Sequence, residues 1–304
     1  MPIPNYCPLC KSDSNKLSVV TKHVFGDTEN KRAFYYCSEC DIRFQYPLLS
    51  PYEEAKFYNA EFETFMSSRS GESGGWKDTE SHIKANQSTV LRRMQYLLPE
   101  LKKGIDILEI GCSSGFMLYP LRELGHNCVG IEPSGFFSEY VRSKDISVYH
   151  SIEDLQRKYQ DVKFDVIMHF FVLEHIVDPL AFLQLQIKLL KPGGKIIFEI
   201  PNAADVLYSV YEIPAFERFY WSIAHPWYFS EKSLTYLLNK LDMKFDILLD
   251  QRYDLSNHIK WARDGKPGGM GMYTNALGEE IEILYKRNLI KTKNCDTLIG
   301  IITL

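Results

Sequence analysis

The chain has 304 residues, of which 45% are hydrophobic and 24% charged, and its formal net charge is −4. This composition is ordinary for a globular protein and excludes a disordered, collagen-like or coiled-coil chain. No apolar stretch approaches the ~18 residues that a membrane-spanning helix needs. The N-terminus, MPIPNYCPLC, lacks the apolar core of a secretory signal. We therefore expect a cytoplasmic protein, and a pI of about 6.1 argues against a broad nucleic-acid-binding face.

Four of the seven cysteines form two CxxC pairs near the N-terminus, separated by 26 residues. Each pair forms a tight turn, and two such turns can converge on one ion with Zn–S distances of ~2.3 Å. The stretches 17–25 and 33–36 between the pairs predict strands of a zinc ribbon. Unrelated cysteines and a redox CxxC are the alternatives. Four protein ligands close a site to chemistry, so we predict structural Zn²⁺ on Cys7, Cys10, Cys37 and Cys40.

The next segment connects this module to the rest of the chain. Residues 51–66 are typical of an amphipathic helix, and the Ser- and Gly-rich residues 67–75 form either a linker or a mobile lid. The apolar spacing predicts another helix over 79–98. We accordingly divide the chain into a zinc-ribbon-like module, a connecting segment with a possible lid, and one large domain: 1–50, 51–98 and 99–304.

From residue 104 onward, short apolar runs alternate with helical stretches. The runs predict strands at 105–110, 127–132, 146–149, 164–170, 195–200, 243–250 and 297–303. Helices are expected between them at 115–125, 135–144, 152–159, 178–190, 231–241 and 277–289. This alternation predicts a doubly wound α/β sheet that is covered on both faces. The glycine-rich insertion at 258–273 is expected to form a surface hairpin or subunit contact, or else a loop over the acceptor site.

Polar motifs follow the first two strands of this domain, where a doubly wound sheet binds its ligand. The first strand ends in LEIGCSSG, which fails the GxGxxG dinucleotide fingerprint and lacks the GK[ST] end of a P-loop. Gly111 in this turn permits close approach of a ligand to the backbone. The second strand ends at Glu132, 21 residues later, where a carboxylate can accept hydrogen bonds from a ribose diol.

Four segments in register, ILEIGCSSG, VGIEPS, FDVIMHFFVLEHIVDP and LLKPGGKIIFEIPN, resemble the class I S-adenosylmethionine-dependent methyltransferases. The resemblance implies a Rossmann-like, seven-stranded sheet and an enzyme that binds S-adenosylmethionine. It further implies that Glu132 holds the ribose hydroxyls and that Glu109 orients the amino group of the cofactor. Ser113 stands where the family usually has glycine. The residues that the resemblance places at the cofactor are Glu109, Gly111, Cys112, Gly115, Glu132, Pro133, Ile152, Glu153, His169 and Phe170.

The tripeptide LEH follows the fourth strand. Methyl transfer is an in-line displacement, so the enzyme mainly aligns the reactants, but a hydroxyl acceptor must also lose a proton. A four-cysteine module combined with this EH pair resembles zinc-containing sugar methyltransferases, in which the histidine acts at the acceptor. We predict His175 as the general base, Glu174 as the neighbour that orients it or binds the acceptor, and His225 as the competing candidate for the base. Aromatic residues near His225 either line an acceptor pocket or pack in the core: Tyr220, Trp221, Trp227, Tyr228 and Phe229.

We expect O-methylation of a small polar acceptor, such as a nucleotide-linked or surface-polysaccharide sugar. C-methylation of a keto sugar is an alternative, although that class usually carries an additional C-terminal domain. Methylation of rRNA is disfavoured because residues 1–50 hold six Lys and Arg against five Asp and Glu, a net charge of only +1. A non-catalytic protein that keeps the cofactor site is the last alternative. The sequence leaves the oligomeric state open.

Overall fold

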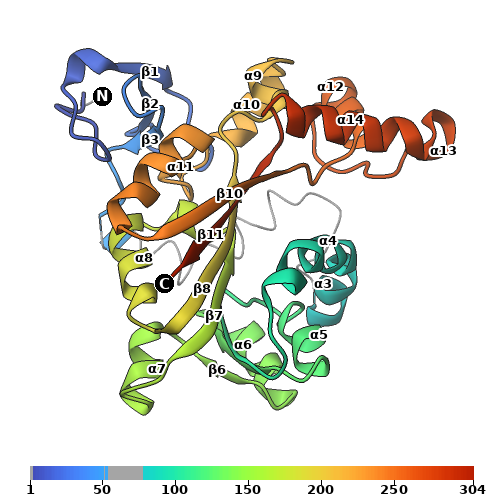
Figure 1. Ribbon diagram of the computed structural model, residues 1–304. Helices are drawn as coiled ribbons and strands as arrows, with labels where there is room; N and C mark the ends of the chain where they lie inside the picture. Colours follow the sequence, from blue (N-terminus) through green and yellow to red (C-terminus); the bar gives the residue numbers. More distant parts are fainter. Residues whose placement is uncertain (1–2, 51, 54–77) are drawn as a thin grey trace.

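Two β-sheets organise the computed structural model, which describes residues 3–50, 52–53 and 78–304. The larger sheet has seven strands in the order β10-β11-β8-β7-β4-β5-β6. The pairs within β8-β7-β4-β5-β6 are parallel, and β11 runs antiparallel to both of its neighbours. The predicted seven-stranded, doubly wound α/β sheet is therefore confirmed (Figure 1).

The seven strands lie close to the predicted apolar runs, because strands covered on both faces are apolar along their whole length. Strand β8 begins earlier than expected, since Leu190 already pairs with Phe164, and the residues 191–194 bulge out before pairing resumes at Lys195. The bounds are β4 Asp106–Ile110, β5 Asn127–Ile131, β6 Ser147–Tyr149, β7 Phe164–Phe170, β8 Leu190–Pro201, β10 Lys244–Asp250 and β11 Thr297–Thr303.

Helices cover both faces of this sheet, as Figure 1 shows. One apolar cluster joins Ile107 and Met168 to Leu97 and Leu118 on the first face. A second joins Leu108 and Ile167 to Leu183 and Leu234 on the opposite face. The first face carries α3 Thr79–Ala85, α4 Gln87–Leu97, α5 Leu118–Glu123 and α6 Gly135–Ser143, and the second carries α7 Ile152–Lys158, α8 Pro179–Ile187 and α11 Glu231–Leu238.

The single helix expected over 79–98 is in fact two helices, so that prediction was wrong. Helix α3 ends and α4 begins at Asn86, whose side-chain amide donates a hydrogen bond of 2.8 Å to the carbonyl of His82. A side chain that bonds its own backbone in this way competes with the helical ladder. The predicted helix at 51–66 and the predicted linker or lid at 67–75 lie outside the described residues, except for Tyr52 and Glu53.

An ion-pair network ties α4 to the sheet. Glu199 of β8 is fully buried, and its carboxylate accepts hydrogen bonds from Arg93 at 2.8 Å and from Tyr96 at 2.7 Å. Arg92 lies 2.5 Å from the same carboxylate and 2.5 Å from Asp250 of β10. Burial raises the pKa of Glu199, but the charge of Arg93 and the hydrogen bond of Arg92 outweigh it and lower the pKa to about 2.

Because of this network, we expect the free energy of unfolding to decrease at acidic pH. Because the pKa of Glu199 is lower in the folded protein, its stabilisation is complete above the unfolded pKa of about 4.3 and is lost as the pH falls toward 2. The loss should amount to roughly 3 kcal/mol. Urea unfolding of the wild type and of Glu199→Gln should therefore differ at pH 7, and the difference should shrink toward pH 3. A difference that stays constant over this range would contradict the assignment.

The smaller sheet combines the N-terminal module with a distant part of the chain. Its order is β1-β2-β3-β9, and β3 pairs with β9 through Arg43 to Tyr228 and Phe44 to Trp227. The module is further fixed by hydrogen bonds from Gln45 N to the carbonyl of Pro226 and from Lys240 Nζ to that of Leu9. These strands are β1 Leu17–Thr21, β2 Ala33–Cys37, β3 Arg43–Tyr46 and β9 Trp227–Tyr228.

The connection between β10 and β11 is helical. Residues 258–273 form no strand, because α12 continues to Asp264 and ends at Gly265, which has a φ of 66°. The predicted surface hairpin was therefore wrong. The remaining helices are α9 Val206–Ser209, α10 Pro214–Tyr220, α12 Leu255–Asp264, α13 Thr274–Leu277 and α14 Glu279–Lys291, with 3₁₀ turns at Ser14–Lys16, Leu98–Glu100, Leu173–His175 and Asn239–Leu241. Among the described residues, no helix combines the length and the apolar character of a membrane span.

Candidate active site

The carboxyl ends of β4 and β5 build a polar cradle. Ser113, which follows β4, has a φ of 48°, and its backbone N–H donates a 2.7 Å hydrogen bond to Glu132 Oε2. The N–H of Ser134 donates to Glu132 Oε1 at 2.8 Å. Each carboxylate oxygen can accept more than one hydrogen bond, so the geometry that fixes Glu132 still suits a ribose diol. Glycines at 111 and 115, with φ of 72° and 76°, keep the turn open for close approach.

Glu109 lies deeper at the same edge. Its side chain is 2% exposed, and Oε2 accepts no hydrogen bond from the described residues. Burial raises the pKa of this carboxyl well above its usual value, which Arg93 opposes and Glu132 reinforces. A cationic ligand would stabilise the charge of both neighbouring carboxyl groups, Glu132 and the buried Glu109, whose Oε2 has no hydrogen-bond partner among the described residues. S-adenosylmethionine carries a sulfonium and an amino group, so the residues present fit this cofactor.

The other residues expected at the cofactor lie in different surroundings. Cys112 is buried beneath the turn, while Pro133 is exposed next to Glu132. At the start of α7, Ile152 is buried in the core and Glu153 is exposed. The thiol of Cys112 fills the space beside Gly130, because a Cβ added to that glycine would lie 2.6 Å from Cys112 Sγ.

His169 and Phe170 end β7 with side chains on opposite faces of the sheet. The imidazole of His169 is fully buried between Phe198, whose ring stacks on it at 5.1 Å, and Phe182. Burial lowers the pKa of His169 to about 3, so the ring is neutral. It packs in the core away from the Glu109 face, which argues against the expected contact between this side chain and the cofactor. Phe170 lies on the Glu109 face, under the guanidinium of Arg93 at 3.9 Å.

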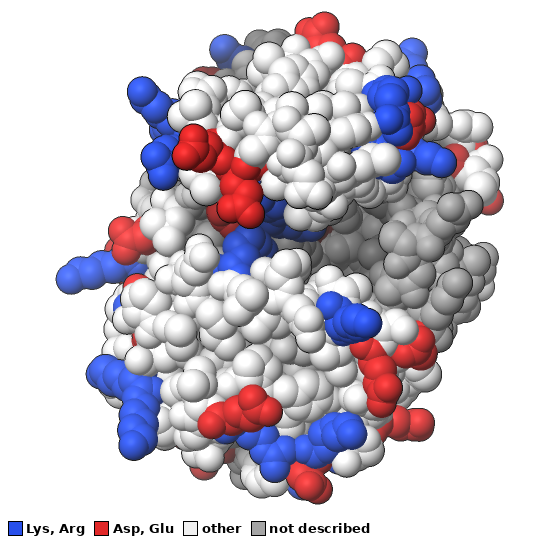
Figure 2. Space-filling view, turned by 90° about the vertical axis from the view of Figure 1, so that its right-hand side faces the viewer, with Lys and Arg blue, Asp and Glu red and all other residues white. Residues whose placement is uncertain are grey.

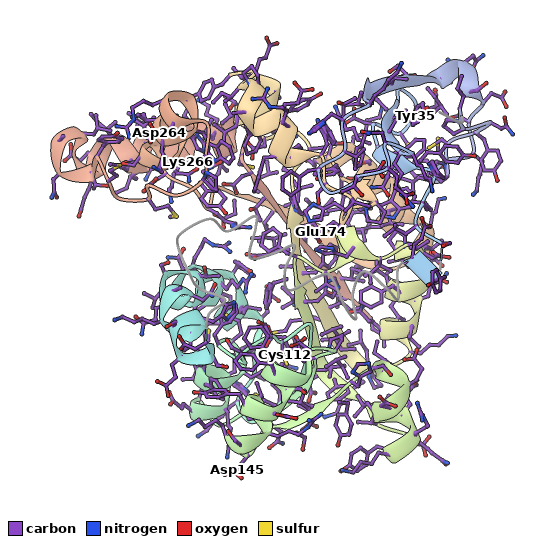
Figure 3. The ribbon with its side chains drawn as sticks, turned by 180° about the vertical axis from the view of Figure 1, so that it is seen from behind. Tyr35, Cys112, Asp145, Glu174, Asp264 and Lys266 are labelled. Atoms are coloured by element: carbon purple, nitrogen blue, oxygen red, sulfur yellow. The ribbon has the colours of Figure 1, made fainter. Side chains whose placement is uncertain are left out.

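Three side chains expected at the acceptor come together just beyond β7. Glu174 and His175 lie on a 3₁₀ turn, and the ring of His175 meets that of His225 edge to face at 4.6 Å. One ligand atom from each of these three residues lies within 4.8 Å of the others. Glu174 is 1% exposed, and burial raises its pKa to about 8, so it is largely protonated at neutral pH. Figure 3 shows Glu174 between the N-terminal module and the turn that carries Cys112.

This trio can act chemically in two ways. A partly exposed imidazole beside a buried carboxyl can take a proton from a hydroxyl group. Two imidazoles and a carboxylate are also a donor set that transition metals accept. The aromatic residues around His225 are buried and pack on one another: Tyr220, Trp221, Trp227, Tyr228 and Phe229. The structure thus favours core packing over an aromatic acceptor pocket at these positions.

Two residues at this edge, His82 and Arg252, were not expected from the sequence. His82 of α3 is buried and hydrogen-bonds Ser114 Oγ through Nδ1 at 2.8 Å, so that α3 packs against the cradle turn. Arg252 lies 4.2 Å from the ring of Phe171 and donates a hydrogen bond to Tyr253 Oη. Arg252 follows β10, which runs in the same direction as β8. The end of a predicted strand could therefore have indicated that Arg252 lies at the carboxyl edge of the sheet. Figure 2 shows a groove between two masses of the protein, with basic and acidic side chains inside it.

The four N-terminal cysteines converge as the CxxC spacing predicts. Cys7 Sγ lies 3.6 Å from Cys40 Sγ, and Cys10 Sγ lies 3.6 Å from Cys37 Sγ. Four thiolates at ~2.3 Å from a tetrahedral ion would be about 3.8 Å apart, so this donor set fits zinc. All four ligand atoms lie within 4.8 Å of one another, at the base of β2 and beside β3.

A seven-stranded sheet with an antiparallel β11, and with acidic residues near the carboxyl ends of β4 and β5, is the arrangement of the class I methyltransferase fold. Residues 82–245 match the family described as "Methyltransferase domain". This match covers more than half of the chain, so the chain belongs to that family.

Similar proteins include ubiquinone biosynthesis O-methyltransferases. The one from Rhizobium etli is 29% identical over 33% of this chain and 42% of its own length. The one from Agrobacterium fabrum is 32% identical over 30% of this chain and 39% of its own length. The chain thus spans about two-fifths of these relatives. A Haloferax volcanii methyltransferase solved with the activator Trm112 has a TM-score of 0.50 and 16% identity, covering 76% of this chain and 97% of that one, which shows the fold alone.

Proposed function

We propose that this methyltransferase transfers the methyl group of S-adenosylmethionine to a hydroxyl group of a small polar acceptor, and that a nucleotide-linked or surface-polysaccharide sugar is the class to test first. The observation that carries the proposal is the meeting of Glu174, His175 and His225 at the edge where the cofactor cradle ends. The similarity to ubiquinone biosynthesis O-methyltransferases supports transfer to oxygen. The resemblance to zinc-containing sugar methyltransferases supports the acceptor class.

The cofactor's role is to supply an electrophilic methyl group when it is bound. In this proposal Glu132 holds the ribose hydroxyls and Glu109 orients the amino group. His175 takes the proton of the acceptor hydroxyl. Neither carboxyl oxygen of Glu174 has a hydrogen-bond partner among the described residues, so the largely protonated Glu174 would donate a hydrogen bond to the acceptor. Incubation with labelled S-adenosylmethionine and a panel of nucleotide-linked sugars tests the acceptor class. Transfer of label to RNA, or to a carbon atom of a keto sugar, would overturn the O-methyl proposal.

Replacing Glu132 with alanine should weaken S-adenosylmethionine binding at least tenfold. Each lost hydrogen bond to a charged group costs about 1.5–3 kcal/mol, and the alanine also releases the turns at Ser113 and Ser134. Calorimetric titration measures the affinity. Glu139→Ala on the exposed side of α6 is the matched control, because it removes the same charge and should leave affinity unchanged. An unchanged dissociation constant in folded Glu132→Ala would exclude this carboxylate from the ribose.

We further propose that Cys7, Cys10, Cys37 and Cys40 bind one structural Zn²⁺. The 3.6 Å separations of their sulfur atoms support this proposal. All four positions of the ion would be filled by protein, so its role would be to hold the small sheet together.

A further inference from the structure

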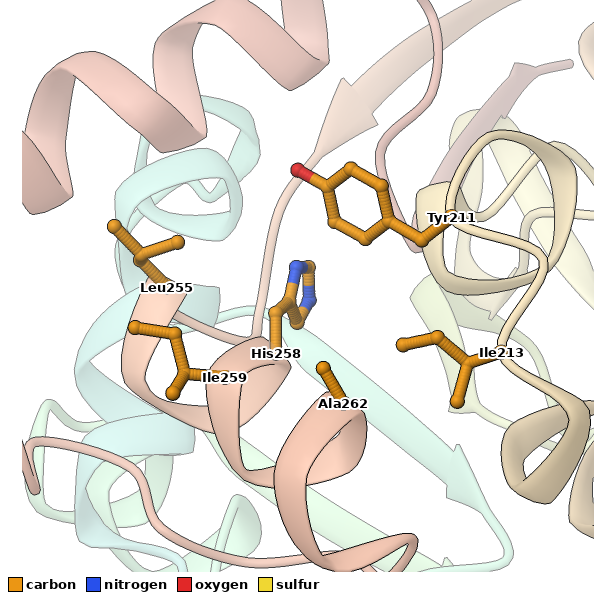
Figure 4. A pocket seen from close by; sticks show the side chains of 6 residues that line it. All are labelled: Tyr211, Ile213, Leu255, His258, Ile259 and Ala262. Atoms are coloured by element: carbon orange, nitrogen blue, oxygen red, sulfur yellow. The ribbon is translucent and has the colours of Figure 1, made fainter.

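A pocket of about 300 Å³ lies away from the cradle, between the segment that joins α9 to α10 and the helix α12. Most of its lining is apolar, as Figure 4 shows: Tyr211, Ile213, Leu255, His258, Ile259 and Ala262. None of these residues belongs to the cofactor cradle or to the acceptor trio. Its volume is at the lower end of the range for small-molecule sites.

The polar feature of this pocket is the imidazole of His258. The side chain is 2% exposed, and Nδ1 lies 2.6 Å from Tyr285 Oη, which in turn lies 2.9 Å from Tyr211 Oη. Nε2 is buried and has no hydrogen-bond partner among the described residues. Figure 4 shows the ring facing the space between Tyr211 and Ile213. A buried polar atom without a partner is costly, so this nitrogen is a place where a ligand would gain a hydrogen bond.

The surroundings define which ligand chemistry fits. None of the six described residues that line the pocket carries a carboxylate, an ammonium or a guanidinium group. Burial lowers the pKa of His258 to about 4, so a ligand would meet a neutral imidazole. When Tyr285 donates to Nδ1, Nε2 carries the proton and donates; when Tyr285 donates to Tyr211, Nε2 accepts. A hydroxyl group satisfies both arrangements, and a carbonyl group satisfies the first.

We propose that this pocket binds a small neutral molecule that is apolar except for one hydroxyl or carbonyl group, which hydrogen-bonds His258 Nε2 while Ile213, Ile259 and Ala262 contact its apolar part. This is a second site, separate from methyl transfer. The test of this second site therefore does not depend on the proposed acceptor.

Phenol and toluene are matched probes, because they differ by one hydroxyl group. We expect saturable binding of phenol to the full chain, with affinity about three- to tenfold higher than that of toluene, as one neutral hydrogen bond provides. In protein labelled with [¹⁵N]histidine, phenol should shift the Nε2 resonance of His258, and toluene should not produce the same shift. Calorimetric titration measures both affinities.

Two variants locate the site. His258→Asn keeps a short acceptor for Tyr285 but does not reach the position of Nε2, so phenol should bind no more tightly than toluene. Ala262→Leu fills the pocket from α12 and leaves the imidazole intact, so both probes should bind more weakly. The proposal is overturned if neither probe binds saturably, if phenol and toluene bind equally to the wild type, or if Ala262→Leu leaves both affinities unchanged. None of these three results depends on the folding of His258→Asn.

Discussion

Replacing His175 with alanine should lower turnover by roughly 10²–10⁴-fold, the usual contribution of a general base. The hydroxyl of a sugar or similar acceptor has too high a pKa to ionise alone near neutral pH. His175 follows β7 at the carboxyl edge, is partly exposed, and lies beside the buried carboxyl of Glu174. Cofactor affinity should stay nearly unchanged, because the imidazole is proposed to face the acceptor. Steady-state rates with the true acceptor, together with calorimetric titration of the cofactor, measure the two effects separately.

Two further variants give this prediction its controls. His225→Ala tests the competing imidazole, whose ring lies 4.6 Å from that of His175, and His23→Ala removes an exposed histidine of the N-terminal module. A base must be unprotonated to act, so the rate should fall toward acid over roughly pH 6 to 9. If only His225→Ala loses the rate and this acidic limb, the base is His225. If neither variant loses the limb, alignment alone drives transfer and the O-methyl proposal fails.

A divalent cation on the same trio would give a different result. Glu174, His175 and His225 would then act as ligands, and the loss in each variant would be accompanied by loss of metal binding. Added Fe²⁺ or Ni²⁺ would raise the rate of the wild type but not that of the variants. Metal-independent turnover supports the imidazole as base.

Much of the large sheet could be predicted because its strands are short, apolar and separated by helices. The cradle could be predicted for a related reason: parallel strands end at one edge, so Glu109 and Glu132 had to lie near each other. The position of the His169 side chain could not be predicted, because the sequence does not show on which face of the sheet each side of β7 lies. Ile167 and His169 share one face of β7, and only the packing of Phe182 from α8 reveals that this face lies opposite Glu109.

Contacts between distant parts of the chain escaped prediction. Strand β9 has two residues, Trp227 and Tyr228, and pairs with β3 across more than half of the sequence. Such a short strand has no periodicity of its own, and its pairing depends on the module that meets it. His82 and Arg93 also contact residues near the cradle. Both lie on helices of the connecting segment, and neither belongs to a sequence motif that would have indicated this contact.

The pairing of β3 with β9 connects the proposed zinc site to the two histidines of the proposed acceptor site. His225 lies two residues before Trp227, whose side chain donates a 2.9 Å hydrogen bond to the carbonyl of Ile176, next to His175. Phe44 of β3 packs on Trp227 with ring centres 6.4 Å apart. A structural change in the N-terminal module would therefore alter the positions of His175 and His225 through β9.

Removing zinc should consequently abolish most of the activity, although the module holds none of the proposed catalytic residues. Structural zinc supplies roughly 10–16 kcal/mol of folding free energy in zinc-finger peptides, so without it the small sheet would depend on its strand pairing and apolar contacts alone. We expect Cys40→Ser, or chelation of the wild type, to release one zinc per chain and to increase hydrogen exchange at residues 43–46 and 227–228.

The large sheet should survive this loss. Glu109, Glu132 and the turn between them belong to β4 and β5, which have no pairing with the module, so S-adenosylmethionine should bind with nearly unchanged affinity while turnover falls. Cys128→Ser, which changes a cysteine of β5 outside the cluster, is the matched control and should retain zinc and turnover. Elemental analysis that finds well under one zinc per chain, in protein that is folded and fully active, would show that the four thiols hold the module without a metal.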